Sequence, residues 1–248
     1  VSFVTLLALE IVAAKWLVLG RVRPGSYPLY GGFSLRKWFI DQLLDLSVDV
    51  LGPLYSTLYL PPWYRALGAR LGRLAEVSTA SFVSPDLLSL EDGSFVADIV
   101  SLGAARVEAG RITVDRIHVG RRSFVGNSAV LPPGTVLGDD CLVGCLSVPP
   151  RPSPGADRVP DGSSWVGSPA MLLPHRAVNL DFPAERTYTP PPRLVALRLA
   201  IEFFRVVLPS AGFLSVAGLM FSLVSILRDE IETWQLCLAF PLLYAGVC

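Results

Sequence analysis

The chain has 248 residues, of which 52% are hydrophobic and 17% are charged, and its 21 basic and 21 acidic side chains cancel. Because no net field would attract nucleic acid, the composition excludes a nucleic-acid-binding protein. It is also the opposite of the polar composition that keeps chains disordered. The four cysteines, Cys141, Cys145, Cys237 and Cys248, fit neither a disulfide framework nor the paired spacing of a zinc site, so no metal is expected.

Apolar residues gather at both ends of the chain. Residues 1–20 are predicted to form a transmembrane helix in which Glu10 and Lys15 pair near one end of the span. Residues 208–227 contain no charge over a length that crosses a ~30 Å hydrocarbon core, which predicts a second transmembrane helix. Residues 236–248 are the expected start of a further span, so the chain reads as a piece of a longer membrane protein.

The basic residues near the span ends predict the orientation. They are Arg21, Arg23, Arg36 and Lys37 after the first span, and Arg193, Arg198 and Arg205 before the second. The turn beyond the second span has Arg228 alone beside three acidic residues. Since Lys and Arg accumulate on the cytoplasmic side, we expect a protein integral to the inner or plasma membrane with the section between the spans in the cytoplasm.

Residues 21–66 are predicted to be interfacial helices and a linker. Ser34 would cap a helix on which Leu35, Trp38, Phe39, Leu43, Leu44 and Leu46 oppose an acidic stripe of Asp41, Asp45 and Asp49. Such a helix would either lie in the water–lipid interface or dock on protein, and the sequence favours neither alternative.

The middle of the chain repeats every six residues. From Val119, an aliphatic residue recurs at Val125, Leu131, Leu137 and Val143, and a small residue follows each by four positions at Ser123, Ala129, Thr135, Cys141 and Ser147. This hexapeptide pattern predicts a mainly β fold, a left-handed parallel β-helix whose triangular prism has 18 residues per coil. The predicted domain covers residues 67–175, with the earlier register at Leu71, Val77, Val83, Leu90, Val96 and Leu102.

Interruptions of the hexads predict where the chain leaves the prism. Leu87 and Arg106 occupy slots that need small residues, and residues 107–118 are the expected excursion. The proline-rich residues 149–164 are predicted to be an ordered loop or lid, and residues 176–207 a linker followed by a helix. The slots that should point outward are instead mostly apolar, which predicts a cover made by neighbouring prisms or membrane helices; they are Ile112, His118, Phe124, Val130, Val136, Leu142 and Val148.

The hexads between apolar spans, with the segments RRSFVGNSAVLPPGTVLGDDCLVG and DGSSWVGSPAMLLP, resemble one known family. It is the carboxy-terminal membrane region of ε-poly-lysine-synthetase-type nonribosomal peptide synthetases. The resemblance implies tandem prisms in a trimer or pseudo-trimer, held in a lipid bilayer, that join amino acids by amide bonds. An adenylation domain and a carrier protein, in this or a partner chain, would supply the amino acid as a phosphopantetheine-linked thioester. The sequence itself contains no adenylation or carrier motif.

Aminolysis of a thioester needs a base for the amine and a donor for the oxyanion, and these requirements select the candidate residues. His118 would be the base, with Asp115 as its orienting group, and Asn127 would donate to the oxyanion. Asp98 would bind the substrate's ammonium group. For each of these residues a purely structural role is the alternative: packing for His118 and turn hydrogen bonds for Asn127 and Asp98.

The turn Gly167, Ser168, Pro169 and Ala170 resembles the GxPA turn of hexapeptide acyltransferases, which implies a groove for a thioester donor; its alternative is a simple solenoid cap. Three functions therefore stay open. The first is a membrane-embedded acyl or aminoacyl transferase that forms peptide bonds. The second is an acyltransferase that uses acyl-CoA. The third is a noncatalytic scaffold prism.

Overall fold

The computed structural model describes residues 2–152, 155–174 and 187–227. The chain divides into two compact units, residues 2–199 and residues 200–248 with residue 1. The candidate site and every cavity discussed below belong to the first unit. The prediction of a further span over residues 236–248 lies outside the described residues.

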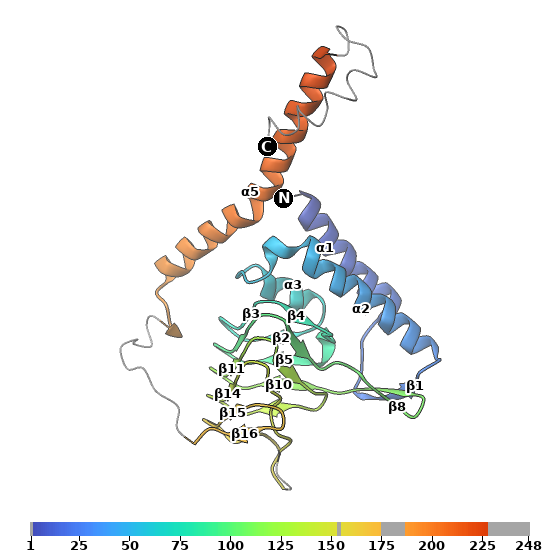
Figure 1. The fold of residues 1–248 in the computed structure, drawn as a ribbon, viewed down its shortest axis with the longest axis vertical. Coiled ribbons are helices and arrows are strands. Elements are labelled where there is room, and N and C mark those ends of the chain that lie inside the picture. Colours follow the sequence, from blue (N-terminus) through green and yellow to red (C-terminus); the bar gives the residue numbers. More distant parts are fainter. Residues whose placement is uncertain (1, 153–154, 175–186, 228–248) are drawn as a thin grey trace. The chain divides into compact units, whose positions relative to one another are not determined.

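Short parallel strands stack into a three-sided prism (Figure 1). Face 1 contains β2 (Arg70–Leu71), β5 (Leu88–Leu90), β10 (Ile117–Val119) and β13 (Val136–Leu137). Face 2 contains β3 (Glu76–Val77), β6 (Phe95–Val96), β11 (Phe124–Val125), β14 (Leu142–Val143) and β15 (Ser164–Val166), with β16 (Met171–Leu172) antiparallel at its end. Face 3 contains β4 (Ala80–Ser81), β7 (Val100–Leu102) and β12 (Val130–Leu131). The chain visits the faces in turn, which confirms the predicted parallel β-helix.

The hexad slots have the predicted positions inside the prism. Val119, Val125, Leu131, Leu137 and Val143 are all fully buried and form the core. The small slots are buried as well, and Ser123 Oγ accepts from Cys141 N of the next coil at 2.9 Å while donating to Gly138 O at 2.8 Å. The large aliphatic side chains therefore fill the interior of the prism, whereas the hydroxyl of Ser123 links neighbouring coils by hydrogen bonds.

The excursions differ in detail from the predicted ones. β8 (Arg106–Glu108) and β9 (Arg111–Val114) form a hairpin that pairs with β1 (Gly25–Pro28), so Ile112 lies on this hairpin and not on a prism face. Residues 117 and 118 belong to β10 and not to the excursion. The predicted loop 149–164 rejoins the prism at Val159, which bridges to Leu137, and ends where β15 begins.

Helices cap the N-terminal end of the prism. α1 (Ser2–Ala14) continues as a π-helical turn (Lys15–Leu19) and rests on α3 (Leu60–Ala66). Two indole N–H groups join them, because Trp63 Nε1 donates to Ala8 O at 2.9 Å and Trp16 Nε1 donates to Ala66 O at 2.8 Å. A solenoid needs such a cap, since its first coil would otherwise expose the hydrophobic core to solvent.

The predicted pairing of Glu10 with Lys15 is wrong. Glu10 is exposed, whereas Lys15 is fully buried and forms an ion pair with Asp86, which follows the first coil of the prism. Residues 2–19 thus contact the prism and its cap through one side, with Ile11 and Lys15 buried. This helix does not reach the length and composition of a membrane span in the part of the chain that is described.

α2 (Gly32–Val50) packs against α1 with its polar side inward. It begins at Gly32, and Ser34 is not its cap but donates from Oγ to Pro28 O at 2.7 Å. Lys37 is buried and its Nζ lies 2.6 Å from Asp41 Oδ1. Burial raises the pKa of Asp41, although Lys37 acts in the opposite direction. The apolar side chains Leu35, Trp38, Phe39 and Leu46 are left exposed.

α5 (Pro192–Leu227) joins the predicted helix and the predicted second span into one helix that contains Pro209. Within the described residues it is the one helix that is long and apolar enough to cross a membrane, judged by length and composition. Its first turns lie on face 2, where Arg198 binds Glu76 through contacts of 2.6 and 2.7 Å. Leu194 and Val195 line a cavity of about 340 Å³ with Phe95, so part of the apolar outer surface is covered by α5.

The buried side chain of Tyr55 contacts α2, where its hydroxyl lies 2.7 Å from Ser47 Oγ. Burial raises the pKa of Tyr55 to about 12. The phenol ionises near pH 10 in the unfolded chain but only near pH 12 in the folded one. The free energy of unfolding therefore has its full value below pH 10 and decreases as the pH rises from 10 to 12, because only the unfolded chain loses the proton in this range. We expect the free energy of unfolding to fall by about 3 kcal/mol across this window. Melting curves of the wild type and Tyr55→Phe from pH 9 to 12 test this, because the variant should show a shallower decline; equal slopes would contradict it.

Candidate functional site

His118 stands in an outward row on face 1 of the prism. The strand register aligns Arg70 with Ser89, Ser89 with His118, and His118 with Val136. Neighbouring strands lie ~4.8 Å apart, so Arg70 and His118 are separated by ~9.6 Å along the row with Ser89 between them. The row therefore brings a guanidinium, a hydroxyl and an imidazole to one surface.

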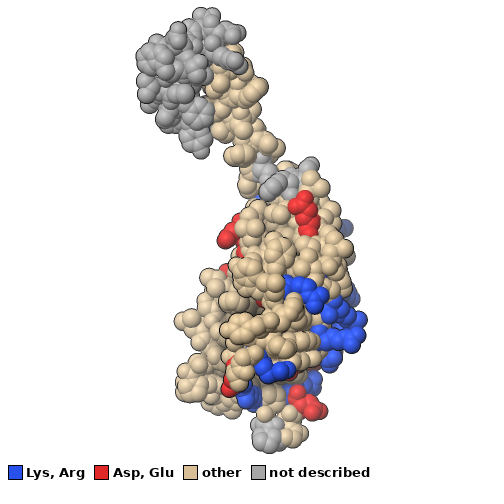
Figure 2. Space-filling view, turned by 90° about the vertical axis from the view of Figure 1, so that its right-hand side faces the viewer, with Lys and Arg blue, Asp and Glu red and all other residues tan. Residues whose placement is uncertain are grey.

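A cleft of about 770 Å³ opens over this row. The segment from Arg21 to Pro24 forms one side, and Asp86 to Ser89 together with Arg116 to His118 form the other. Four exposed arginines line it, Arg21, Arg23, Arg70 and Arg116, and in the described part of the chain none of them forms an ion pair. Figure 2 shows that basic side chains gather on one side of the prism, whereas acidic ones are scattered.

Asp86 is the single carboxylate among the residues that line the cleft. Lys15 Nζ lies 2.9 Å from both of its oxygens, and Val22 N donates to Oδ2 at 3.0 Å. The two side chains expose 0% and 3% of their surface, so the pair is desolvated and its charges compensate each other. The cleft thus keeps the positive charge of the arginines, which suits an anionic ligand.

The predicted partners of His118 are not beside it. Asp115 does not line the cleft, and its Oδ1 accepts from Arg116 N at 2.7 Å. Asn127 and Asp98 lie at the corner between faces 2 and 3, where Asp98 N donates to Asn127 Oδ1 at 3.3 Å. Ser78 Oγ and Thr79 Oγ1 both donate to Asp98 Oδ1. These contacts link consecutive turns, as in the structural alternative for both residues.

Gly167, Ser168, Pro169 and Ala170 form the turn between β15 and β16. Gly167 has a φ of 84° and donates from its N to Ser147 Oγ at 2.8 Å. This turn continues the same corner as Asn127, because Val148 N donates to Gly167 O and Leu146 N donates to Asn127 O. Within one prism, this turn therefore lies at the corner between faces 2 and 3, whereas His118 lies on face 1.

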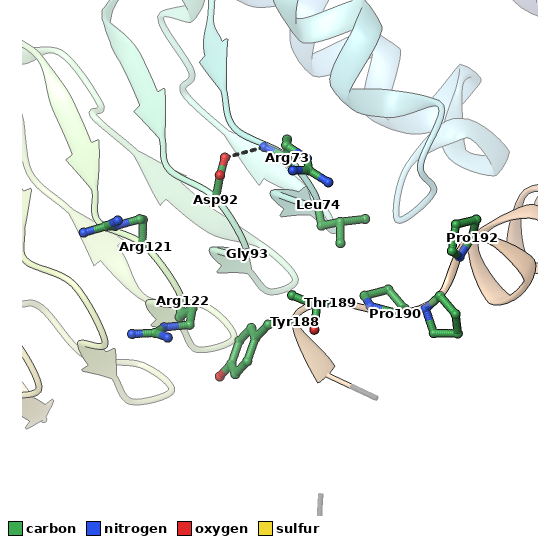
Figure 3. A pocket seen from close by; sticks show the side chains of 11 residues that line it. Arg73, Leu74, Asp92, Gly93, Arg121, Arg122, Tyr188, Thr189, Pro190 and Pro192 are labelled. Carbon is green, nitrogen blue, oxygen red and sulfur yellow. Dashed lines mark hydrogen bonds between the residues drawn. The ribbon is translucent and has the colours of Figure 1, made fainter. Parts of the chain in front are cut away.

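A second cavity of about 620 Å³ lies at the corner between faces 1 and 2 (Figure 3). Its arginines differ from those of the cleft, because Arg121 binds Asp139 at 2.8 Å and Arg122 binds Asp140 at 2.6 Å. The hydrogen bonds from Arg121 lower the pKa of Asp139. The guanidinium carbon of Arg122 also lies 5.9 Å from the ring centre of Tyr188. This cavity contains no histidine, and two of its arginines are already neutralised.

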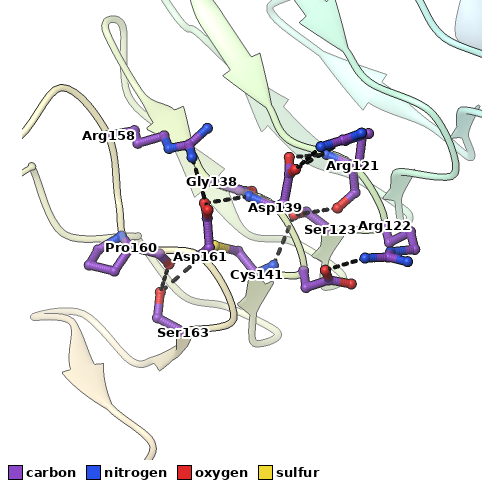
Figure 4. Close-up of polar contacts among 11 residues, drawn as sticks. Arg121, Arg122, Ser123, Gly138, Asp139, Cys141, Arg158, Pro160, Asp161 and Ser163 are labelled. Carbon is purple, nitrogen blue, oxygen red and sulfur yellow. Dashed lines mark hydrogen bonds and ion pairs between the residues drawn. The ribbon is translucent and has the colours of Figure 1, made fainter.

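Cys141 has a structural role, as its interior slot predicts (Figure 4). Its Sγ donates to Pro160 O at 3.1 Å, and burial raises the pKa of the thiol. A raised pKa disfavours the thiolate, which is the nucleophilic form. Cys145 is exposed, and neither cysteine lines the cleft.

No protein-family model matches the chain. Over 233 residues, the chain is 37% identical to Delta-poly-L-ornithine synthetase of Acinetobacter baumannii. The alignment covers 93% of this chain but 17% of that protein, so the chain spans about a sixth of its relative's length. The chain is thus related to a segment of a poly-amino-acid synthetase.

Solved structures with similarity to the chain include three acetyltransferases. A maltose O-acetyltransferase from Clostridium difficile is 13% identical with a TM-score of 0.38, over 70% of this chain and 88% of that chain. A hexapeptide-repeat acetyltransferase from Vibrio cholerae is 12% identical with a TM-score of 0.37, over 68% and 90%. A galactoside acetyltransferase in complex with coenzyme A is 14% identical with a TM-score of 0.38, over 69% and 91%.

Proposed function

We propose that the chain is a membrane-embedded aminoacyltransferase unit that forms amide bonds from an aminoacyl thioester carried on the phosphopantetheine arm of a carrier protein. The observation that carries the proposal is the cationic cleft of face 1 with His118 in its wall. The cleft combines positive charge for a phosphate-bearing donor with an imidazole, the side chain that most often serves as a general base. The similarity to Delta-poly-L-ornithine synthetase supports amide formation between amino acids.

In the proposed reaction, the nitrogen of the acceptor amine attacks the thioester carbonyl carbon, and His118 accepts the proton that this amine loses. Ser89, which lies beside His118 in the row, donates a hydrogen bond to the oxyanion that forms. The carbon–sulfur bond then breaks, and His118 returns the proton to the departing sulfur. The products are one amide and one free thiol, and His118 is regenerated.

Three predicted roles require that a second prism contributes: oxyanion binding by Asn127, binding of the substrate's ammonium group by Asp98, and a donor groove at the turn from Gly167 to Ala170. Since these residues lie at the corner between faces 2 and 3, they would meet His118 of face 1 across the interface of a trimer or pseudo-trimer. Phe124 and Val130, which remain 39% and 40% exposed on the outer surface, would supply apolar area for such an interface. Asp115 would act only by fixing the backbone at Arg116.

The proposed location is the membrane, with the prism on the cytoplasmic side. α5 would cross the bilayer, and the exposed Leu35, Trp38 and Phe39 of α2 would lie in the water–lipid boundary. Labelling of the exposed Cys145 in sealed vesicles, with Cys237 and Cys248 replaced by Ser, tests the orientation. Labelling from the noncytoplasmic side alone would contradict it.

The donor distinguishes this function from its alternatives. The full chain in nanodiscs should release a radiolabelled amino acid from a charged carrier protein when an amine acceptor is added, and should form the amide. An acyl-CoA-dependent acyltransferase would ignore the charged carrier and use the CoA thioester. A scaffold prism would use neither donor, and that result would refute an enzymatic role for this chain.

A further inference from the structure

We propose that the cleft of face 1 is a phosphate site, and that Lys15 keeps it cationic by forming the buried ion pair with Asp86. The ligand is the phosphate ester of a pantetheine arm, whether on a carrier protein or in CoA. This inference rests on the proposed function, because the donor's chemistry supplies the phosphate.

The four arginines that line the cleft form no ion pair in the described part of the chain. Arg21 and Arg23 come from the segment before β1, whereas Arg70 and Arg116 come from the coils, so residues far apart in the sequence meet at one opening. Arginine presents a planar set of donors that binds phosphate oxygens in a bidentate manner. Like charges held together without counter-charges repel one another, and an anion bound among them would remove this cost.

Asp86 is the acidic residue that lines the cleft. Its carboxylate borders the same cleft, and without compensation it would oppose an anion directly. Lys15 Nζ contacts both carboxylate oxygens at 2.9 Å and also lies 3.4 Å from the centre of the Trp16 ring. This lysine is fully buried, and Asp86 is the carboxylate with which it forms its ion pair. Gly68 leaves room for the pair, since a Cβ there would lie 3.4 Å from Lys15 Nζ and closer still to Asp86 Oδ1.

The outward row of face 1 runs from Arg70 to His118. Arg70, Ser89 and His118 follow one another across neighbouring strands, and the other arginines surround them. A phosphate held by the arginines would let the flexible arm extend along face 1 toward His118. The size of the cleft, about 770 Å³, is within the usual range of ~300–1,000 Å³ for small-molecule sites.

The test compares two probes, 4′-phosphopantetheine and pantetheine, which differ only in the phosphate. With the full chain in nanodiscs, calorimetry should show tighter binding of the phosphorylated probe. Arg70→Gln and Arg116→Gln should each weaken this binding about tenfold, which corresponds to the ~1.4 kcal/mol of a lost charge-assisted contact, and should leave pantetheine unaffected. Arg73→Gln is the matched control, because Arg73 is exposed nearby but lines the second cavity. Equal binding of both probes by the wild type would overturn the proposal.

The role of Lys15 is tested by a double-mutant cycle. Lys15→Met leaves the carboxylate of Asp86 uncompensated, so binding of 4′-phosphopantetheine should weaken at least tenfold. Adding Asp86→Asn removes that charge and should restore binding to within about threefold of the wild type. If the double variant binds as weakly as Lys15→Met, the pair is merely structural. Should Lys15→Met fail to fold, Asp86→Asn alone decides, since a loss of affinity in this variant would contradict a role in charge compensation.

Further arms separate the sources of the phosphate and the two proposals. Competition by charged carrier protein but not by CoA identifies the carrier-borne arm, and the opposite result identifies CoA. If phosphate-dependent binding is present while amide formation is undetectable, the site stands and the proposed function fails. If amide formation occurs but the arginine variants bind and react like the wild type, the function stands and the phosphate site fails.

Discussion

Replacing His118 with Ala should lower the rate of amide formation by about 10²- to 10⁴-fold, the usual contribution of a positioned acid–base group. The physical reason is that an amine attacking a thioester must lose a proton, and His118 is the one imidazole in the cleft. The measurement is single-turnover aminolysis of a charged carrier protein by the full chain in nanodiscs. Free imidazole in the assay should restore part of the rate, because the cleft is open to solvent and the variant leaves a space.

Two controls separate catalysis from folding. The imidazole of His118 points outward, so the melting temperature of the variant should stay close to that of the wild type. Val136→Ala, which shortens the next side chain in the same outward row, should retain most of the activity. A rate for His118→Ala within twofold of the wild-type rate would exclude His118 as the base and favour the scaffold alternative.

The prism is predictable from the sequence because its six-residue repeat of aliphatic and small residues is a strictly local pattern. Every aliphatic slot from Val119 to Val143 is buried, and Arg106, which breaks the pattern, begins the excursion hairpin. The small slots were also predictable, since a triangular coil leaves no room for large side chains at its corners. Such a repeat needs only a period of six to be recognised, and no long-range pairing has to be guessed.

The cleft was harder to predict because it depends on long-range contacts. From the sequence alone, Arg21 and Arg23 indicate only the membrane orientation, and Glu10 is the acidic residue nearest to Lys15 along the chain. The hairpin of β8 and β9 draws β1 to the prism and with it the preceding arginines. One signal was available: Arg70, Ser89 and His118 all precede an aliphatic slot, so stacking the hexads would have placed them in one row.

The second large effect is expected for Gly126→Ala, which should destabilise the fold by about 3 kcal/mol, at the upper end of the range for overpacking. Gly126 follows the interior residue Val125, and its backbone meets the next coil. A Cβ there would lie 2.7 Å from Cys145 N, 2.8 Å from Gly144 C and 3.0 Å from Val143 O. These are backbone atoms, so the strain cannot be relieved by a side-chain rotation. The coils must separate, which weakens the hydrogen bond from Gly126 N to Val143 O.

Thermal unfolding of the full chain measures this effect, and ~3 kcal/mol corresponds to a decrease of roughly 6–12 °C in Tm for a chain of this size. Gly52→Ala is the matched control, because no atom lies within 4 Å of its added Cβ and its φ is outside the left-handed region. This control should leave Tm unchanged or raise it slightly, since alanine restricts the unfolded chain. Equal melting temperatures for Gly126→Ala and the wild type would show that the coils can move apart at little cost. The glycines after the aliphatic slots would then reflect something other than the close approach of neighbouring coils.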